Sequence, residues 1–149
     1  MMRKGTASSR PILCLLLVLL CITACGKQPT YTEAPLSGQE VAIDVSLLSD
    51  GVPHFFRYHY QGRNINFFVV KMEGKVLSFF DACMKCYPKR LGFRFDNGSV
   101  VCKACSEQYP LTEIEKGFGS CYPIRLEGRL QDHVYRIPVS AIQTMADKF

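Results

Sequence analysis

Four cysteines stand in two close pairs, Cys83 and Cys86 in Cys-Met-Lys-Cys, and Cys102 and Cys105 in Cys-Lys-Ala-Cys. Cysteines three positions apart fit on one tight turn, from which both sulfurs face the same ion. Two such turns make a four-sulfur cage of the kind that binds zinc, a single iron or an iron–sulfur cluster. The spacing C-x2-C-x15-C-x2-C lies within the range of known metal sites, so these four cysteines are the predicted ligands.

The same pairs allow two other interpretations. A closed zinc site would be structural and would carry no chemistry of its own. Without a metal, Cys-x-x-Cys pairs cycle between dithiol and disulfide, or form plain disulfide staples. A further cysteine, Cys121, is a candidate extra ligand, a resolving thiol for disulfide exchange, or a buried structural thiol.

The N-terminus, residues 1–24, is predicted to be a lipoprotein signal peptide. A basic start precedes an apolar run over residues 11–21, which is too short for an ordinary membrane-spanning helix. The run ends in Ile-Thr-Ala-Cys-Gly, which resembles a bacterial lipobox and makes Cys25 the expected lipidated residue. We therefore expect the protein in the bacterial cell envelope, outside the cytoplasm, anchored to membrane lipid through Cys25.

Removal of the signal changes the cysteine count and the charge. Cys14 and Cys21 leave with the signal and Cys25 carries lipid, so five of the eight cysteines remain. An odd number favours metal ligation over a disulfide framework. The mature part has 15 Lys and Arg against 13 Asp and Glu, a net charge of +2, which does not indicate a nucleic-acid partner. No nucleophile–base arrangement or phosphate-binding loop stands out, so a non-enzymatic role is favoured over an enzymatic one.

The mature chain is divided into a flexible tether, 25–39, and one domain, 40–149. The tether is polar and contains two prolines, and the domain is rich in strand patterns separated by turn residues. Glu73-Gly74 and Asp96-Asn97-Gly98 are predicted hairpin turns. The expected strands are 41–46, 55–60, 65–72, 75–80, 93–95, 99–101, 124–126 and 133–137. Ser140 is expected to cap a short final helix. The prediction is a mainly β fold, a compact antiparallel β barrel or sandwich with two Cys-x-x-Cys knuckles and little helix.

Both cysteine pairs are expected to follow strands, 75–80 and 99–101, whose antiparallel pairing would bring the knuckles together. Phe79 and Phe80 adjoin the first pair and could exclude water from the site. The basic residues around the pairs would stabilise thiolates, or form a solvated face; they are Lys85, Lys89, Arg90 and Lys103. The three histidines are interpreted as ordinary surface or strand residues; they are His54, His59 and His133.

Three ordered elements carry a resemblance to a known family: Asp-Ala-Cys-Met-Lys-Cys at 81–86, Cys-Lys-Ala-Cys at 102–105, and Gly-Ser-Cys-Tyr-Pro-Ile at 119–124. The chain resembles the FtrD-like membrane iron–sulfur containing proteins over roughly residues 40–145. The resemblance implies a membrane-associated, extracytoplasmic iron–sulfur protein, linked to iron transport and electron transfer. It also implies ligation by Cys83, Cys86, Cys102 and Cys105, with Cys121 as the family's fifth cysteine.

The leading hypothesis is thus a lipid-anchored electron-transfer or metal-binding protein with an iron–sulfur cluster or a mononuclear iron. Its expected partner is a membrane transporter, for iron uptake, or a respiratory redox protein. A structural-zinc module and a thiol–disulfide redox protein remain alternatives.

Overall fold

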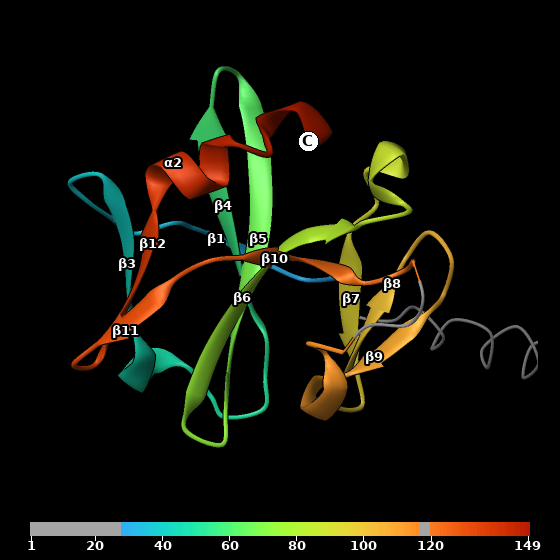
Figure 1. Ribbon diagram of the computed structural model, residues 1–149, viewed down its shortest axis with the longest axis horizontal. Coiled ribbons are helices and arrows are strands. Elements are labelled where there is room, and N and C mark those ends of the chain that lie inside the picture. Colours follow the sequence, from blue (N-terminus) through green and yellow to red (C-terminus); the bar gives the residue numbers. More distant parts are fainter. Residues whose placement is uncertain (1–27, 117–119) are drawn as a thin grey trace, which may run out of the picture.

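The computed structural model describes residues 28–116 and 120–149, whose strands form three β-sheets (Figure 1). The five-stranded sheet has the order β1 (Tyr31–Glu33), β4 (His54–Tyr60), β5 (Arg63–Met72), β6 (Lys75–Cys83) and β10 (Pro123–Leu126). The four-stranded sheet has the order β11 (Arg129–Gln131), β12 (Val134–Pro138), β3 (Glu40–Asp44) and β2 (Leu36–Ser37). The three-stranded sheet has the order β7 (Phe93–Asp96), β8 (Ser99–Cys102) and β9 (Gln108–Pro110). Short helical segments are η2 (Val45–Leu47), η3 (Tyr87–Lys89), η4 (Leu111–Glu113), α2 (Val139–Gln143) and η5 (Ala146–Lys148).

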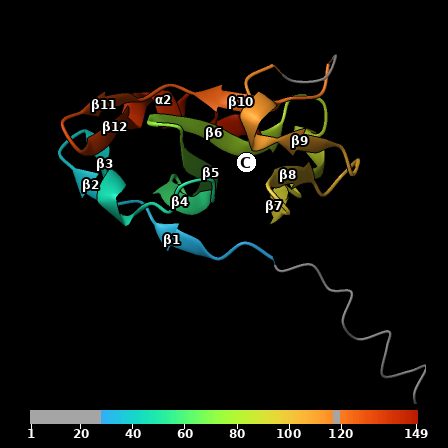
Figure 2. The same ribbon diagram turned by 90° about the horizontal axis from the view of Figure 1, so that it is seen from below.

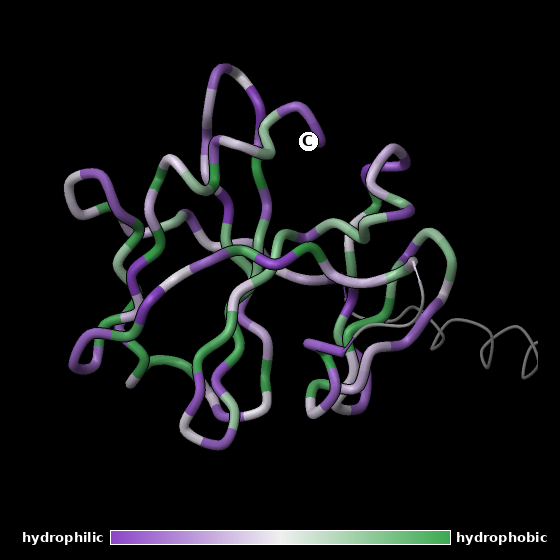
Figure 3. The backbone as a smooth tube through the Cα atoms, viewed as in Figure 1, coloured by the Kyte–Doolittle hydropathy of each residue, from purple (hydrophilic) through white to green (hydrophobic). Residues whose placement is uncertain are grey.

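The five-stranded sheet is covered on both faces, and β5 shows why. Residues 67–70 of this strand are all fully buried, a continuous run typical of a strand with no solvent face. Because side chains alternate along a strand, Phe67 and Val69 enter one core, while Phe68 and Val70 enter another. Figures 1 and 2 show the four-stranded and three-stranded sheets on different sides of the central one. Figure 3 shows hydrophobic residues along these strands and hydrophilic residues at most loop tips.

The first core joins the central sheet to the four-stranded sheet; its buried members include Val41, Ile43, Phe56, Ile65, Phe67, Val69, Phe80, Leu126, Tyr135, Ile137 and Ile142. The second, the cysteine core, joins the central sheet to the three-stranded sheet; its buried members are Phe55, Phe68, Val70, Leu77, Phe79, Cys83, Phe93, Val100, Cys102, Tyr109, Leu111 and Ile114. The structure thus confirms the mainly β fold with little helix. None of the described sheets closes on itself, so of the two expected architectures it is the sandwich that fits.

The expected hairpin turns are present between β5 and β6 and between β7 and β8. Glu73 and Gly74 have φ of 50° and 78°, and Asn97 and Gly98 have φ of 44° and 77°. Positive φ at both central residues matches the twist of the flanking strands, which is why such pairs favour two-residue hairpins. The second hairpin matters most for the site, because it carries Cys102 at the end of β8.

The structure differs from the expected flexible tether over 25–39. Residues 31–33 form β1, which pairs with β4 in parallel, and residues 36–37 form β2, which pairs with β3. The described chain is therefore part of the folded domain from Tyr31 onward. The polar composition of this segment gave no sign of the pairing, because both strands are short and largely exposed. The rest of the expected tether and signal, up to residue 27 and including Cys25, lies outside the described residues.

Other differences are smaller. Strand β6 continues to Cys83 instead of ending at Phe80, and β9 was not expected. The final helix begins at Val139 after Pro138, so Ser140 lies inside the helix and the prediction that it is the cap was wrong. Pro138 occupies the cap position, with φ of −59° and ψ of 131°, and no side chain caps this helix.

Candidate metal centre

The two cysteine pairs meet where β6 and β8 end. Cys83 is the last residue of β6, and Cys102 is the last residue of β8. The sulfur atoms of Cys83, Cys86 and Cys102 all lie within 4.8 Å of one another. The strand ends therefore bring together three of the four predicted ligands, as the spacing indicated. No histidine belongs to a group of this kind in the described part of the chain.

The first turn folds around the sulfur of Cys83. The backbone N–H of Cys86 donates to the carbonyl of Cys83 at 3.0 Å, which closes the turn. The backbone N–H groups of Lys85 and Cys86 also donate to the Cys83 sulfur. Hydrogen bonds to a sulfur stabilise its thiolate form and are one of the ways in which a protein tunes an iron–thiolate centre.

The second turn repeats the amide-to-sulfur hydrogen bonds around Cys102 but closes one residue later. The N–H of Ser106 donates to the carbonyl of Cys102 at 2.8 Å, and the N–H groups of Ala104 and Cys105 donate to the Cys102 sulfur. Ser106 has φ of 63°, the left-handed conformation that ends the turn. Two loops of unrelated sequence thus present their first cysteine in the same way, which is typical of paired metal-binding knuckles.

Cys105 and Cys121 lie at the edge of this group. Cys105 is exposed, and its thiol is within hydrogen-bonding reach of Cys86 and Cys102. Cys121 is half-buried, packs against the cysteine core, and its thiol interacts with that of Cys83. All five cysteines of the described chain therefore gather at one place and are free thiols.

The ionisation of these cysteines depends on hydrogen bonds from backbone amides and on burial. Burial raises the pKa of Cys83, but hydrogen bonds from the Lys85 and Cys86 amides outweigh it, and the pKa falls below the ordinary value. Burial and the neighbouring thiols Cys105, Cys102 and Cys83 raise the pKa of Cys86 to about 12. Burial also raises the pKa of Cys102. Cys83 is thus the cysteine that most readily becomes a thiolate. Cys86 and Cys102 stay protonated beside it unless a cation offsets the additional negative charge.

A buried tyrosine completes the environment of Cys83. The hydroxyl of Tyr109, which is 1% exposed, lies 3.8 Å from the Cys83 sulfur. Burial, together with the hydrogen bond to Cys83, raises the pKa of Tyr109. The hydroxyl therefore stays protonated and donates a hydrogen bond to the sulfur. The ring packs edge-on against Phe93 at a centroid distance of 6.0 Å. No spacing rule pointed to Tyr109, because it lies on a strand that the sequence did not predict.

Asp81 joins the elements that carry the cysteines. Its carboxylate is buried and accepts hydrogen bonds from the Tyr31 hydroxyl at 2.5 Å and from the Phe93 N–H at 2.7 Å. Burial raises the pKa of Asp81, against the effect of these bonds. A Cβ on Gly92, which has φ of 66°, would lie 2.3 Å from this carboxylate. The Gly92 carbonyl in turn accepts from the N–H of Lys103 at 3.0 Å, which links the second knuckle to the same point.

The sulfur geometry fits a single metal ion. Metal–sulfur bonds of about 2.3 Å in a tetrahedron place the sulfurs about 3.8 Å apart, so three sulfurs within 4.8 Å need little movement to share one ion. A cavity of about 40 Å³ beside Cys83, Cys86 and Cys102 has room for an ion or a water molecule. Asn66 lines the same cavity, and its buried Oδ1 makes no hydrogen bond within residues 28–116 and 120–149.

Comparison with known proteins identifies one family. The family model described as "Membrane iron-sulfur containing protein FtrD-like" matches residues 48–149. No curated protein and no solved structure matches the chain. The match covers both knuckles and Cys121, and the family is described as membrane-associated. The described residues contain no helix that is long and apolar enough to span a membrane.

Proposed function

Since this chain belongs to the FtrD-like membrane iron–sulfur containing protein family, we propose that it is an electron-transfer protein whose iron centre is held by Cys83, Cys86, Cys102 and Cys105. The observation that carries the proposal is the pair of matching knuckles, which bring three sulfurs within 4.8 Å and direct backbone amides at two of them. Iron held by thiolates exchanges single electrons, whereas zinc held in the same way does not.

The surroundings of the sulfurs support a redox role. Cys83 and Cys102 are each 2% exposed and lie in an apolar core, which limits the access of water to a centre held there. The Tyr109 hydroxyl and four backbone amides donate to these two sulfurs and would stabilise the more negative, reduced state. Cys105, on the exposed side, would give electrons a short route to the surface. The role of Cys121 in this proposal is a fifth thiol that can replace a ligand.

The surface around the centre would serve as the docking face for a redox partner. Met84 and Tyr122 are 36% and 38% exposed, and the Met84 N–H donates to the Tyr122 carbonyl at 2.9 Å, so these side chains belong to neighbouring loops. Lys85 is exposed beside them, and Lys103 is partly exposed on the second knuckle. A small apolar area with a basic border fits a partner with an acidic rim, such as a membrane transporter of iron or a respiratory redox protein.

The expected lipid anchor would hold this face near the membrane. Lipidation of Cys25 remains a prediction, since this residue lies outside the described part. Gln28, three residues later, accepts a hydrogen bond from Lys103 Nζ at 3.2 Å. Three residues span at most about 10 Å. A lipid on Cys25 would therefore keep the second knuckle within about 10–15 Å of the bilayer surface, on the extracytoplasmic side, where membrane partners are within reach.

Metal analysis of the full chain, purified without air from cells supplied with iron and zinc, tests the proposal. We expect iron near stoichiometry and a visible absorption band, both lost in Cys102→Ser and both retained in Lys103→Ala, the adjacent control. Acid-labile sulfide then separates a cluster from a single iron. A colourless protein with one zinc would refute the redox proposal in favour of a structural module, and two disulfides without metal would favour thiol exchange.

A further inference from the structure

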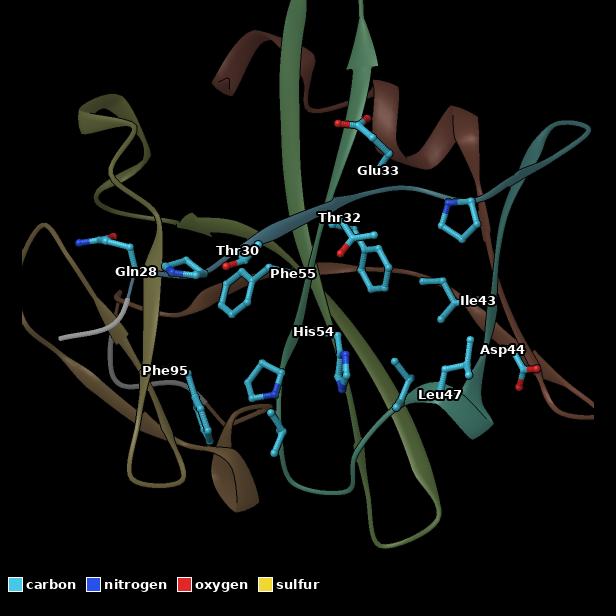
Figure 4. Close-up of a pocket in the computed structure, with 16 residues that line it drawn as sticks. Gln28, Thr30, Thr32, Glu33, Ile43, Asp44, Leu47, His54, Phe55 and Phe95 are labelled. Atoms are coloured by element: carbon cyan, nitrogen blue, oxygen red, sulfur yellow. The ribbon is translucent and has the colours of Figure 1, made fainter.

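An apolar pocket of about 610 Å³ lies apart from the cysteine centre (Figure 4). It is bounded by β4, by the segment around η2, by the start of the described chain, and by Phe95 of β7. Most of its lining is apolar and includes Ile43, Leu47, Val52 and Phe55. The volume is in the range of pockets that bind small organic molecules, and neither the knuckles nor the family assignment accounts for it.

Six of the residues that line this pocket are polar, and His54 is the one whose ring lies beside the apolar floor; the others are Gln28, Thr30, Thr32, Glu33 and Asp44. Figure 4 shows the imidazole of His54 among the apolar side chains. Its Nε2 accepts a hydrogen bond from the backbone N–H of Ser49 at 3.1 Å. Burial lowers the pKa of His54, so at neutral pH the ring is neutral and its proton lies on Nδ1. Within the described residues this Nδ1–H has no hydrogen-bond acceptor, which leaves one donor for a ligand.

A series of aromatic rings connects the pocket to the cysteines. Phe55 lines the pocket and lies 5.3 Å from Phe68, measured between ring centroids. Phe68 lies 6.0 Å from Phe93, and Phe93 lies 6.0 Å from Tyr109. The Tyr109 hydroxyl is 3.8 Å from the Cys83 sulfur. The ring-to-ring steps are ordinary aromatic contacts, and with the hydroxyl–sulfur contact they join the pocket to the centre.

We propose that this pocket binds the ring of a quinone-class redox carrier, with the ring against Phe55 and Phe95 and one carbonyl oxygen on the His54 Nδ1–H. A quinone combines a flat apolar ring with carbonyl acceptors, which matches the apolar part of the lining and the His54 donor. An acyl chain would fill the apolar space but would leave the donor unpaired. A redox role for this pocket rests on the proposed function, whereas binding of the quinone does not require a metal.

Tryptophan substitutions provide the test, because the chain has no tryptophan. Leu47→Trp places one at the pocket, and Leu130→Trp places one on β11, outside the lining; the native side chains are 76% and 47% exposed, so both should fold. Each full-length variant is reconstituted in phosphatidylcholine nanodiscs and titrated with menadione, a quinone without a long tail. Val52→Trp, at a second lining residue, repeats the measurement should Leu47→Trp fail to fold.

We expect saturable quenching for Leu47→Trp and only linear, collisional quenching for Leu130→Trp. His54→Leu in the Leu47→Trp background should weaken binding about tenfold, because the carbonyl loses its hydrogen bond. Equal linear quenching in both reporters would overturn the proposal. Displacement of menadione by undecanoate, with binding insensitive to His54→Leu, would overturn it in favour of an acyl-chain site. Iron content is measured on the same samples: loss of binding with normal iron refutes only this inference, and binding without iron refutes only the proposed function.

Discussion

The two faces of the central sheet show how one strand serves two purposes. On one face, Phe67 and Val69 of β5 pack into a core of hydrocarbon side chains with one buried Tyr135–Ser78 hydroxyl pair. On the other, Phe68 and Val70 pack into a core that also contains thiols, the Tyr109 hydroxyl and the Asp81 carboxylate nearby. The first core is built for stability alone. The cysteine core gives part of its volume to polar groups, among them the Cys83 and Cys102 thiols that are the proposed metal ligands.

The two cores also differ in the size of their outer sheets. The first core lies under a four-stranded sheet, whose longest pairing joins β3 and β12 over five residue pairs. The cysteine core lies under strands of three or four residues, which are joined to the central sheet by the Asp81–Phe93 and Tyr109–Cys83 hydrogen bonds and by side-chain packing. A metal bound to Cys83 and Cys102 would cross-link β6 to β8, that is, the central sheet to the three-stranded sheet. The metal would thus join two sheets that share no strand pairing.

Metal removal should therefore have the largest effect on stability, and that effect should be confined to the three-stranded sheet. Chelation of the iron-loaded full chain should cost several kcal/mol of local stability in β7, β8 and β9, since metal-binding energy is folding energy where ligands join two elements. Hydrogen exchange measures this as a loss of amide protection there, with protection in β3 and β12 retained. Equal loss of protection in both sheets would show that the metal stabilises the whole domain and not this attachment.

Truncation of Phe68 and Phe67 compares the cores directly. Both rings are fully buried neighbours on β5, so Phe68→Ala and Phe67→Ala should each lower the free energy of unfolding by about 3–5 kcal/mol. Only Phe68 contacts Phe93, which packs on Tyr109, so only Phe68→Ala should also reduce iron occupancy. Urea unfolding and iron content check both statements, and the milder Phe→Leu pair serves if the alanine variants do not fold. Iron loss in both variants would refute the separation of the cores.

Gly92 tests the junction between the knuckles. Gly92→Ala should cost about 3 kcal/mol, because the residue has φ of 66° and its Cβ would lie 2.3 Å from the Asp81 carboxylate. The matched control is Gly98→Ala in the β7–β8 turn, where φ is 77° but no atom lies within 4 Å of the new Cβ. That variant should cost only about 1 kcal/mol. Equal costs in chemical denaturation would mean that the Asp81 contact contributes nothing.

The sequence predicted most of this arrangement where the signal was local. Alternating and aromatic runs identified the long strands, and Glu73-Gly74 and Asn97-Gly98 identified two hairpins, because their backbone requirement is contained in two residues. The Cys-x-x-Cys spacing likewise identified Cys83, Cys86 and Cys102 as neighbours. A knuckle is also a local structure, so its position could be predicted without knowledge of the fold.

What could not be predicted depends on contacts between distant segments. Tyr31 lies 50 residues from Asp81 in sequence, and the hydrogen bond between them exists only because β1 pairs in parallel with β4. Tyr109 reaches Cys83 from β9, a strand of three residues without a clear pattern. Tyr31 and Tyr109 were missed for this reason, although the cysteines and the neighbouring Phe79 were predicted.

Two buried tyrosines allow a smaller comparison. Tyr109→Phe removes the hydrogen bond to Cys83, and Tyr135→Phe removes one to Ser78 at 3.0 Å in the first core. Each should cost about 1 kcal/mol in unfolding free energy. Only Tyr109→Phe should lower the reduction potential and shift the visible band of the iron-loaded protein, because the reduced centre loses a donor. Unchanged potential in Tyr109→Phe, measured by redox titration, would show that the hydroxyl has a packing role alone.

The smallest expected effect concerns the pH dependence of stability at His54, in the pocket that adjoins both cores. Burial lowers its pKa from 6.5, so the unfolded chain binds a proton that the folded chain does not. The contribution of neutral His54 to stability should therefore be fully present above pH 6.5. It should be lost as the pH falls from there toward the lower pKa of the folded state. In His54→Gln this part of the dependence should disappear, as measured by urea unfolding between pH 5 and 7.5. Because the ring is only partly buried, the change should be smaller than that caused by either tyrosine. A steeper pH dependence in the variant would mean that the protonated ring is stabilised in the pocket, and would also argue against a neutral His54 that donates to a quinone.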